Sequence, residues 1–175
     1  MEQVILVNER DDEIGTMPKM EAHIKGELHR AFSIFIFNKK KEMLLQQRSV
    51  EKYHSGGLWT NACCSHPRPN EENMDAANRR LHEELGFTTP LQKIFHFTYN
   101  ASLDNGLIEH EFDHVFIGTY NGEIIPNPDE VKEYFYQSMD EIEASIRQMP
   151  EKYTAWFCIA FPKVKEWLAS QNGGE

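Results

Sequence analysis

Short blocks of apolar residues alternate with polar segments along the chain, and the longest of them predict strands. The nearly unbroken apolar run from His29 to Phe37 predicts a strand buried on both faces, followed by a charged turn at 38–42 and a partner strand at 43–48. Asp104-Asn105-Gly106 predicts a hairpin between two further strands, 91–101 and 108–120. Shorter strands are expected at 3–7, 58–62 and 133–137, and a turn-rich segment is expected at 8–15.

Helical periodicity appears in the segments 18–22, 73–85, 140–147 and 153–169. In the second of these, one buried stripe is predicted by the helical spacing of Met74, Ala77, Leu81 and Leu85. Asn73 is expected to cap this helix at its N-terminus, and Gly86 is expected to end it. Helices that alternate irregularly with strands and hairpins indicate an α/β or α+β fold with a mixed sheet.

The composition is that of a folded protein. Hydrophobic residues make up 40% of the 175 residues, which suffice for one domain, 1–175, with a sizeable core. A net charge of −10 argues against nucleic acid or an anionic membrane as a partner. No stretch has the length of a membrane span or the pattern of a signal peptide. Three cysteines, two of them adjacent, make no disulfide framework, so the chain is expected to be cytoplasmic.

The segment 60–87 carries the densest group of reactive and charged residues in the chain. Its run Arg79-Arg80-Leu81-His82-Glu83-Glu84 places two arginines four positions before two glutamates, so two ion pairs are expected on the helix surface. An ordinary amphipathic surface helix would also explain these pairs. However, the run follows Glu71 at the interval of a Nudix box and is followed by Gly86, and the segment resembles that box.

The resemblance to the Nudix box has two departures. Ser65 stands where the box opens with glycine, and Arg80 replaces a glutamate that pyrophosphohydrolases of this family use to bind catalytic metal. The resemblance implies an α/β fold, a Nudix-like α/β/α sandwich with a mixed central sheet. The lost carboxylate implies that the scaffold serves other chemistry than pyrophosphate hydrolysis.

Two carboxylates and three histidines form a candidate metal site. Glu109 and Glu111 are two positions apart on a predicted strand, so both point to the face that Val115 continues into the core. Carboxylates on a core face need a metal or a proton as a partner, although a solvated strand face would also place them together. The three histidines are His23, His29 and His66. Their spacing is not that of a compact zinc motif, and each of them alone could equally have a purely structural role.

Five separated motifs together resemble the type 1 isopentenyl-diphosphate delta-isomerases over most of the chain. They are Lys19–His23, Leu28–Ser33, Trp59–Pro67, the altered Nudix box and Glu109–Glu111. The resemblance implies an isomerase that interconverts isopentenyl diphosphate and dimethylallyl diphosphate, in isoprenoid biosynthesis, by protonation and deprotonation through a tertiary carbocation. It also implies a divalent metal, Zn²⁺ or Mn²⁺ to judge from the ligand types, held by His23, His29, His66, Glu109 and Glu111.

The resemblance further implies the residues that move protons. Cys64 and Glu111 match the two groups that flank the substrate double bond. Glu111 is expected to protonate C4 and the Cys64 thiolate to remove a proton from C2, with the roles exchanged in the reverse reaction. Trp156 matches the aromatic residue that faces the cation, and Tyr99 matches the partner of Glu111, although both could be ordinary core aromatics. Cys63 is expected to be structural.

The diphosphate needs cations. The resemblance assigns this task to basic positions that would otherwise be solvated surface charges, Lys19, Arg48, Lys52 and Arg80. Arg80 then explains the altered box, because an arginine grips a diphosphate that a carboxylate would repel. Glu84 matches a ligand of the Mg²⁺ that accompanies the diphosphate. The segment 1–25, which carries Lys19 and His23, is expected to act as a lid.

Two alternatives stay open at the level of the sequence. One is a Nudix-type hydrolase of a nucleoside diphosphate derivative, against which Arg80 argues. The other is a catalytically silent protein that binds a metal or a diphosphate, against which the presence of both Cys64 and Glu111 argues. The expected partner is a small isoprenyl diphosphate substrate, and the chain is expected to be a monomer or a weak homodimer.

Overall fold

The computed structural model describes residues 1–173 of the chain, in which nine strands form one sheet and four α-helices pack around it. The strands are β1 (Gln3–Val7), β2 (Glu13–Pro18), β3 (His29–Phe37), β4 (Met43–Arg48), β5 (Trp59–Thr60), β6 (Cys63–Ser65), β7 (Leu91–Ser102), β8 (Ile108–Thr119) and β9 (Val131–Gln137). The helices are α1 (Lys19–Lys25), α2 (Asn73–Leu85), α3 (Met139–Gln148) and α4 (Ala155–Asn172).

Strand β3 is the centre of the sheet. It pairs in parallel with β8 along its whole length and antiparallel with β1, β4 and β6. On the far side of β8, β7 pairs antiparallel with it through the predicted hairpin, and β9 pairs antiparallel with β4. Because parallel and antiparallel pairs occur together, the expected mixed sheet is confirmed.

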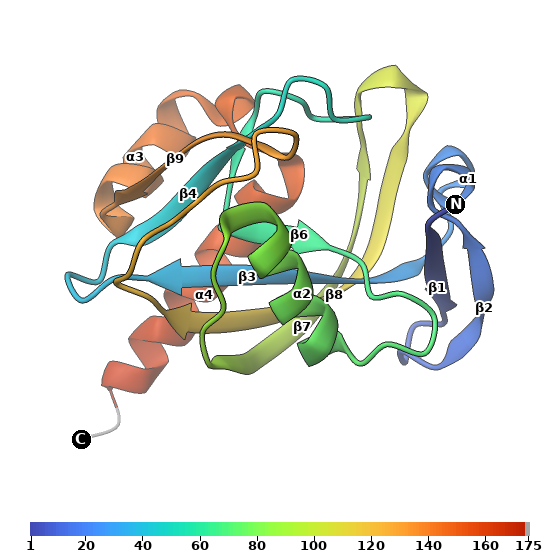
Figure 1. The fold of residues 1–175 in the computed structure, drawn as a ribbon, viewed down its shortest axis with the longest axis horizontal. Coiled ribbons are helices and arrows are strands. Elements are labelled where there is room, and N and C mark those ends of the chain that lie inside the picture. Colours follow the sequence, from blue (N-terminus) through green and yellow to red (C-terminus); the bar gives the residue numbers. More distant parts are fainter. Residues whose placement is uncertain (174–175) are drawn as a thin grey trace.

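Alternate side chains of β3 enter two different cores, because successive residues of a strand point to opposite faces. Phe32, Ile34 and Ile36 pack with Leu81 and Leu85 of α2. The other face carries Phe35 and Phe37, which pack with the apolar side of α4, including Trp156, Phe157, Phe161 and Val164. Figure 1 shows α2 in front of the sheet and α4 behind it, so the expected α/β/α sandwich is confirmed.

Three details differ from the sequence-based prediction. Residues 13–18, of which 13–15 were expected in a turn-rich segment, form the edge strand β2, in which no side chain is buried and no alternating apolar signal appears. The predicted strand 58–62 is shortened to β5, which pairs with β4, and the cysteines that follow it lie in a separate strand, β6, against β3. Met74 is exposed, and Ala76 shares the buried face of α2 in its place.

The predicted end of α2 is confirmed. Gly86 adopts a left-handed conformation with φ 75°, and its N–H bonds the carbonyl of His82. A Cβ on this glycine would lie 2.7 Å from the carbonyl oxygen of Ile125, so both the conformation and the close approach require glycine. The helix starts one residue earlier than expected, with Glu72 at the N-cap position in place of Asn73. No helix within residues 1–173 has the length and apolar character needed to cross a bilayer.

Candidate active site

Five buried side chains that are far apart in the sequence converge on one point. Their candidate ligand atoms all lie within 4.8 Å of one another, and the residues are His23, His29, His66, Glu109 and Glu111. This is the set that the sequence analysis assigned to a divalent metal. The arrangement could hold a metal ion, since imidazole nitrogens and carboxylate oxygens are common ligands of such ions.

The sheet brings these residues together. His29 of β3 and Tyr99 of β7 are both in register with Glu111, which lies on the strand between them. Glu109 and Glu111 share one face of β8, as their spacing predicted, and both are buried. The short strand β6 pairs with β3, and His66 follows directly after it. His23 lies on α1, in the N-terminal segment.

The geometry of the imidazoles fits metal binding. The Nδ1 of His23 lies 2.7 Å from the carbonyl oxygen of Lys19, and the Nδ1 of His29 lies 2.8 Å from that of Glu27. A carbonyl only accepts hydrogen bonds, so both Nδ1 atoms carry the proton, and in the neutral ring the Nε2 lone pair is free. His29 Nε2 lies 3.2 Å from His66 Nε2, within the group of candidate metal-ligand atoms.

The carboxylates contact the same imidazole nitrogens. Glu111 Oε2 lies 2.6 Å from His66 Nε2 and 3.3 Å from His29 Nε2, and Glu109 Oε1 lies 3.3 Å from His23 Nε2. Burial opposes ionisation of Glu111, but a protonated His29 imidazole and the Tyr99 hydroxyl outweigh it and lower the pKa. Burial lowers the pKa of His66 well below its usual range, so this imidazole is neutral and able to bind a cation.

The adjacent cysteines point to opposite sides of the sheet. Cys63 is fully buried in the core beside α2, in agreement with the structural role expected for it. Cys64 faces the α4 side, where its Sγ lies 3.1 Å from Asn61 Oδ1 and accepts a hydrogen bond from Trp156 Nε1, also at 3.1 Å. The Cys64 thiol is therefore positioned by two polar partners, the Asn61 side-chain oxygen and the Trp156 indole N–H.

Cys64 is a thiol in this pocket. Burial and the nearby carboxyl of Asp113 raise its pKa to about 12. Burial therefore opposes formation of the thiolate expected at Cys64, and sequence spacing carries no information on this desolvation.

The two predicted aromatic residues lie in the same region. The hydroxyl of Tyr99 donates a short hydrogen bond to Glu111 Oε1. Trp156, in the first turn of α4, contacts Cys64 through its indole N–H, and the guanidinium carbon of Arg48 lies 5.2 Å from the centre of its ring. The structure therefore brings the four expected catalytic side chains together around the metal-ligand cluster.

A cavity of about 350 Å³ joins the reactive residues to the predicted cations. Cys64 and His66 lie on its wall, and so do all the basic side chains assigned to a diphosphate, Lys19, Arg48, Lys52 and Arg80. Carboxylates pair with several of these cations, for example Glu130 with both Lys52 and Arg80. The cavity therefore offers positive charge beside a thiol and a metal-ligand cluster, with its cations partly neutralised by neighbouring acids.

Glu84 lies apart from the five-residue cluster. One of its oxygens accepts a hydrogen bond from Arg80 Nη2 at 2.7 Å, and the other accepts from Gln46 Nε2 at 2.9 Å. The side chain is buried behind Arg80 and does not line the cavity. The i,i+4 pairing of these two residues was predicted and is confirmed, and so is the pairing of Arg79 with Glu83.

Four buried polar residues next to the site were missed by the sequence analysis: Ser33, His54, Asn61 and Asp113. Ser33 Oγ donates to Asp113 Oδ2 at 2.7 Å and lies 3.5 Å from Cys64 Sγ. Asp113 had a signal, because it continues the period-two series of Glu109 and Glu111 on one strand face. Ser33 and Asn61 lie within motifs that resemble the family, but their place beside Cys64 depends on the pairing of β3 with β6.

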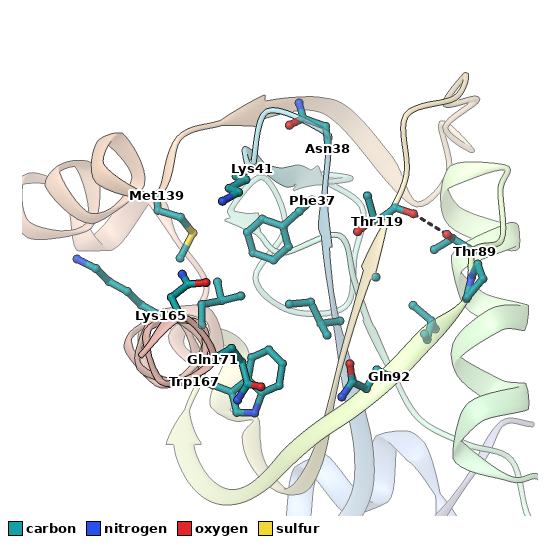
Figure 2. Close-up of a pocket in the computed structure, with 16 residues that line it drawn as sticks. Phe37, Asn38, Lys41, Thr89, Gln92, Thr119, Met139, Lys165, Trp167 and Gln171 are labelled. Carbon is teal, nitrogen blue, oxygen red and sulfur yellow. Dashed lines mark hydrogen bonds between the residues drawn. The ribbon is translucent and has the colours of Figure 1, made fainter. Parts of the chain in front are cut away.

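A larger cavity, of about 820 Å³, lies elsewhere on the molecule (Figure 2). It is lined by the C-terminal part of α4, including Trp167 and Gln171, and by Phe37, Met139 and Gln92 from other elements. Its described lining contains no histidine, cysteine, aspartate or glutamate. None of the residues expected to move protons or bind metal therefore lines this cavity, whereas Cys64 and His66 line the smaller one.

Comparison with solved structures supports the fold. The DR0079 protein of Deinococcus radiodurans superposes with a TM-score of 0.76 at 18% sequence identity, covering 93% of this chain and 98% of that one. A MutT protein from Methanosarcina mazei Go1 gives 0.66 at 21% identity, covering 79% and 94%. At such low identity the similarity concerns the fold alone.

Comparison with known sequences is far more specific. The NUDIX domain family matches residues 27–157. A protein named Isopentenyl-diphosphate Delta-isomerase from Pectobacterium atrosepticum is 52% identical over 171 residues, covering 97% of this chain and 96% of that protein. Isopentenyl-diphosphate Delta-isomerase 2 from Aromatoleum aromaticum is 50% identical, covering 93% and 86%. The chain therefore belongs to the NUDIX domain family and, within it, to the isopentenyl-diphosphate Delta-isomerases.

Proposed function

We propose that this protein interconverts isopentenyl diphosphate and dimethylallyl diphosphate, the reaction that the name of its relatives indicates. The observation that carries the proposal is one cavity in which Cys64 and His66 face four basic side chains. A diphosphate bound to those cations places a short hydrocarbon chain beside the thiol. Arg80 stands at the position where pyrophosphohydrolases have a metal-binding glutamate, which argues against hydrolysis.

We assign a divalent metal, Zn²⁺ or Mn²⁺, to the five-residue cluster. Its mixture of imidazole and carboxylate donors suits both ions, and the protonated Nδ1 atoms of His23 and His29 leave their Nε2 atoms available. When bound, the ion supplies positive charge that stabilises the ionised form of Glu111. The chain itself fixes the imidazoles and carboxylates in place through β3, β8 and α1.

We propose that Cys64 and Glu111 share the two proton transfers. One of them protonates C4 of isopentenyl diphosphate, and a tertiary cation forms at C3. The other, in its deprotonated form, removes a proton from C2, and the double bond moves to C2–C3. Protonation by Glu111 and deprotonation by Cys64 in this direction stay a prediction from the sequence. The reverse reaction exchanges the two roles.

The surrounding side chains serve the cation and the diphosphate. The Trp156 ring offers a negative π face to the positive charge at C3, and Tyr99 keeps Glu111 oriented through its hydrogen bond. Lys19, Arg48, Lys52 and Arg80 bind the diphosphate. Glu84 would hold the Mg²⁺ that accompanies the diphosphate after exchanging one of its present hydrogen bonds, because it lies behind Arg80 and not on the cavity wall.

The segment 1–25 supplies both His23 to the cluster and Lys19 to the cavity wall, so we assign it the role of a lid within a single domain, 1–175. Lys19 is paired with Glu2 at 2.7 Å and lies 4.7 Å from the centre of the Tyr53 ring. We further propose that the protein acts in the cytoplasm as a monomer or weak homodimer, without nucleic-acid or membrane partners.

The test is a reaction in deuterated water followed by NMR, with isopentenyl diphosphate, Mg²⁺ and either Zn²⁺ or Mn²⁺. Dimethylallyl diphosphate with deuterium in the new methyl group is the expected product, because proton addition occurs at C4. Release of phosphate would instead favour a hydrolase. Unchanged substrate in the presence of bound metal would favour a catalytically silent binding protein, and a screen of nucleoside diphosphate derivatives would follow.

A further inference from the structure

His54 lies in the loop between β4 and β5 and points toward the metal-ligand cluster, although the sequence analysis gave it no role. The residue is buried, with 2% of its surface exposed. Its Nε2 lies 3.3 Å from Glu109 Oε2, the oxygen that does not face His23. Neither atom has a hydrogen-bond partner among the described residues. The two atoms lie close together but are not aligned as a hydrogen bond, so both buried polar atoms are unsatisfied in this structure, which is costly.

The loop fixes the position of His54. Arg48 Nη2 donates to the carbonyl oxygen of His54 at 3.2 Å, and the N–H of Ser55 donates to Asp104 Oδ1 at 2.9 Å. A Cβ on Gly56 would lie 2.6 Å from the carbonyl oxygen of Val50, so the chain can turn at this point only with glycine. The direction of the imidazole is therefore set by the loop and not by chance packing.

The other ring nitrogen has its own partner. His54 Nδ1 lies 3.1 Å from Ser55 Oγ, whose hydroxyl can donate to it. The ring is further packed against Tyr53 and Trp156, with centroid distances of 4.3 and 5.7 Å. When Ser55 donates to Nδ1, the proton of the neutral ring is on Nε2 and faces the Glu109 carboxylate.

We propose that His54 is a positioning residue of the metal centre, whose Nε2–H would donate to the neighbouring Glu109 Oε2 and hold that carboxylate in place when the cluster binds a metal ion. The inference rests on the metal centre proposed above. His54 does not belong to the set of five residues whose ligand atoms cluster within 4.8 Å, so it acts through Glu109 and not as a ligand. Partners of this kind hold ligands in orientation, and their loss weakens metal binding by roughly 10- to 100-fold.

The test compares two substitutions of similar polarity but different reach. In His54→Gln the amide nitrogen occupies the region of Nε2 and still reaches Glu109, whereas in His54→Asn the shorter amide does not. Zn²⁺ and Mn²⁺ dissociation constants are measured on the full chain by competition with a chromophoric chelator. His82→Asn, which removes an exposed imidazole from α2, is the matched control.

His54→Asn is expected to bind metal roughly 10- to 100-fold more weakly than the wild type, with His54→Gln within about threefold of it. Circular dichroism and thermal unfolding of the metal-free proteins establish that both variants fold. Equal affinities of the Gln and Asn variants would overturn the role of His54 while leaving the metal centre intact. A wild-type chain that binds neither metal would overturn the metal centre, and the role of His54 with it.

Discussion

His29 and Glu111 occupy paired positions on the parallel strands β3 and β8, with Nε2 3.3 Å from Oε2. The same carboxylate oxygen lies 2.6 Å from His66 Nε2, and Tyr99 is paired with Glu111 from the opposite strand. The register of three neighbouring strands therefore decides which side chains meet at Glu111. A slip by one residue would turn Glu111 to the other face of the sheet.

Shortening this carboxylate tests its place in the cluster. Glu111→Asp withdraws the oxygens by one methylene from His29, His66 and Tyr99. We expect metal affinity to fall at least about tenfold and turnover to fall by about 100-fold or more. Equilibrium dialysis and the NMR assay measure the two effects, with Glu123→Asp, on an exposed loop, as the control. Wild-type metal affinity in Glu111→Asp would show that Glu111 is not a ligand.

The thiol of Cys64 is expected to be essential. Cys64→Ser keeps the size and hydrogen-bonding capacity of the side chain, but the hydroxyl exchanges protons far less readily. Turnover should fall by about 10²- to 10⁴-fold, with metal binding unchanged. Cys158→Ser, at a half-buried position on α4 outside the cavity, should retain full activity. Undiminished turnover in Cys64→Ser would remove Cys64 from the mechanism.

Adjacent arginines on α2 allow a matched test of diphosphate binding. Arg80 lines the cavity, whereas Arg79 pairs with Glu71 and Glu83 outside it. Arg80→Lys keeps the charge but loses the forked geometry, so KM should rise by about 10- to 100-fold through the loss of a charged hydrogen bond. Arg79→Lys should leave KM unchanged. A similar KM for both variants and the wild type would exclude Arg80 from the diphosphate site.

His114 should make folding sensitive to mild acid. It is buried with its Nε2 2.9 Å from Asp11 Oδ2, and burial lowers its pKa to about 4 from the ordinary 6.5, against the opposing effect of Asp11. Between these pH values the unfolded chain binds a proton that the folded chain does not, so stability falls as the pH falls from 6.5 toward 4. The loss attributable to His114 is at most about 3 kcal/mol.

Urea unfolding of the wild type and of His114→Gln over this pH range measures the effect. Other buried histidines contribute to the wild-type slope, so the difference between the two proteins isolates His114. We expect a shallower dependence on pH in the variant. Parallel curves for the two proteins would refute a depressed pKa at His114.

The buried stripe of α2 can be tested by truncation. Leu81→Ala should reduce the free energy of unfolding by about 2 to 5 kcal/mol, because Leu81 is completely buried between helix and sheet. Met74→Ala, at a residue that is 37% exposed, should change it by less than about 0.5 kcal/mol. Chemical denaturation provides both values. An equal decrease in the free energy of unfolding for both variants would mean that Met74 lies on the buried face, as the helical spacing alone predicted.

Much of the fold could be predicted from local patterns. The apolar run at 29–37, the Asp-Asn-Gly hairpin and the alternation of Glu109 and Glu111 each follow from strand geometry alone. The edge strand β2 could not be predicted, because none of its side chains is buried and its sequence shows no alternation. Pairing between β3 and β8 also lay beyond local patterns, since it joins segments about 80 residues apart.

The site was predictable only in part. The set of three histidines and two glutamates came from the resemblance to a family, because no local spacing connects His23 with Glu109, 86 positions later. His54 carries no motif, and its proximity to Glu109 arises from a loop whose path is decided by Gly56 and Asp104. The protonation of Cys64 depends on burial, which only the assembled structure reveals.

The contribution of His23 to the cluster affects how firmly the N-terminal segment is attached to the sheet. Strand β1 pairs with β3 only through Leu6 and His29, so the N-terminal segment has few ladder contacts with the rest of the sheet. A metal held by both His23 and Glu109 would act as a cross-link that closes a loop of 86 residues. Removal of the metal would then open this cross-link, and the buried side chains of β1 and α1 would alone hold the segment against the sheet.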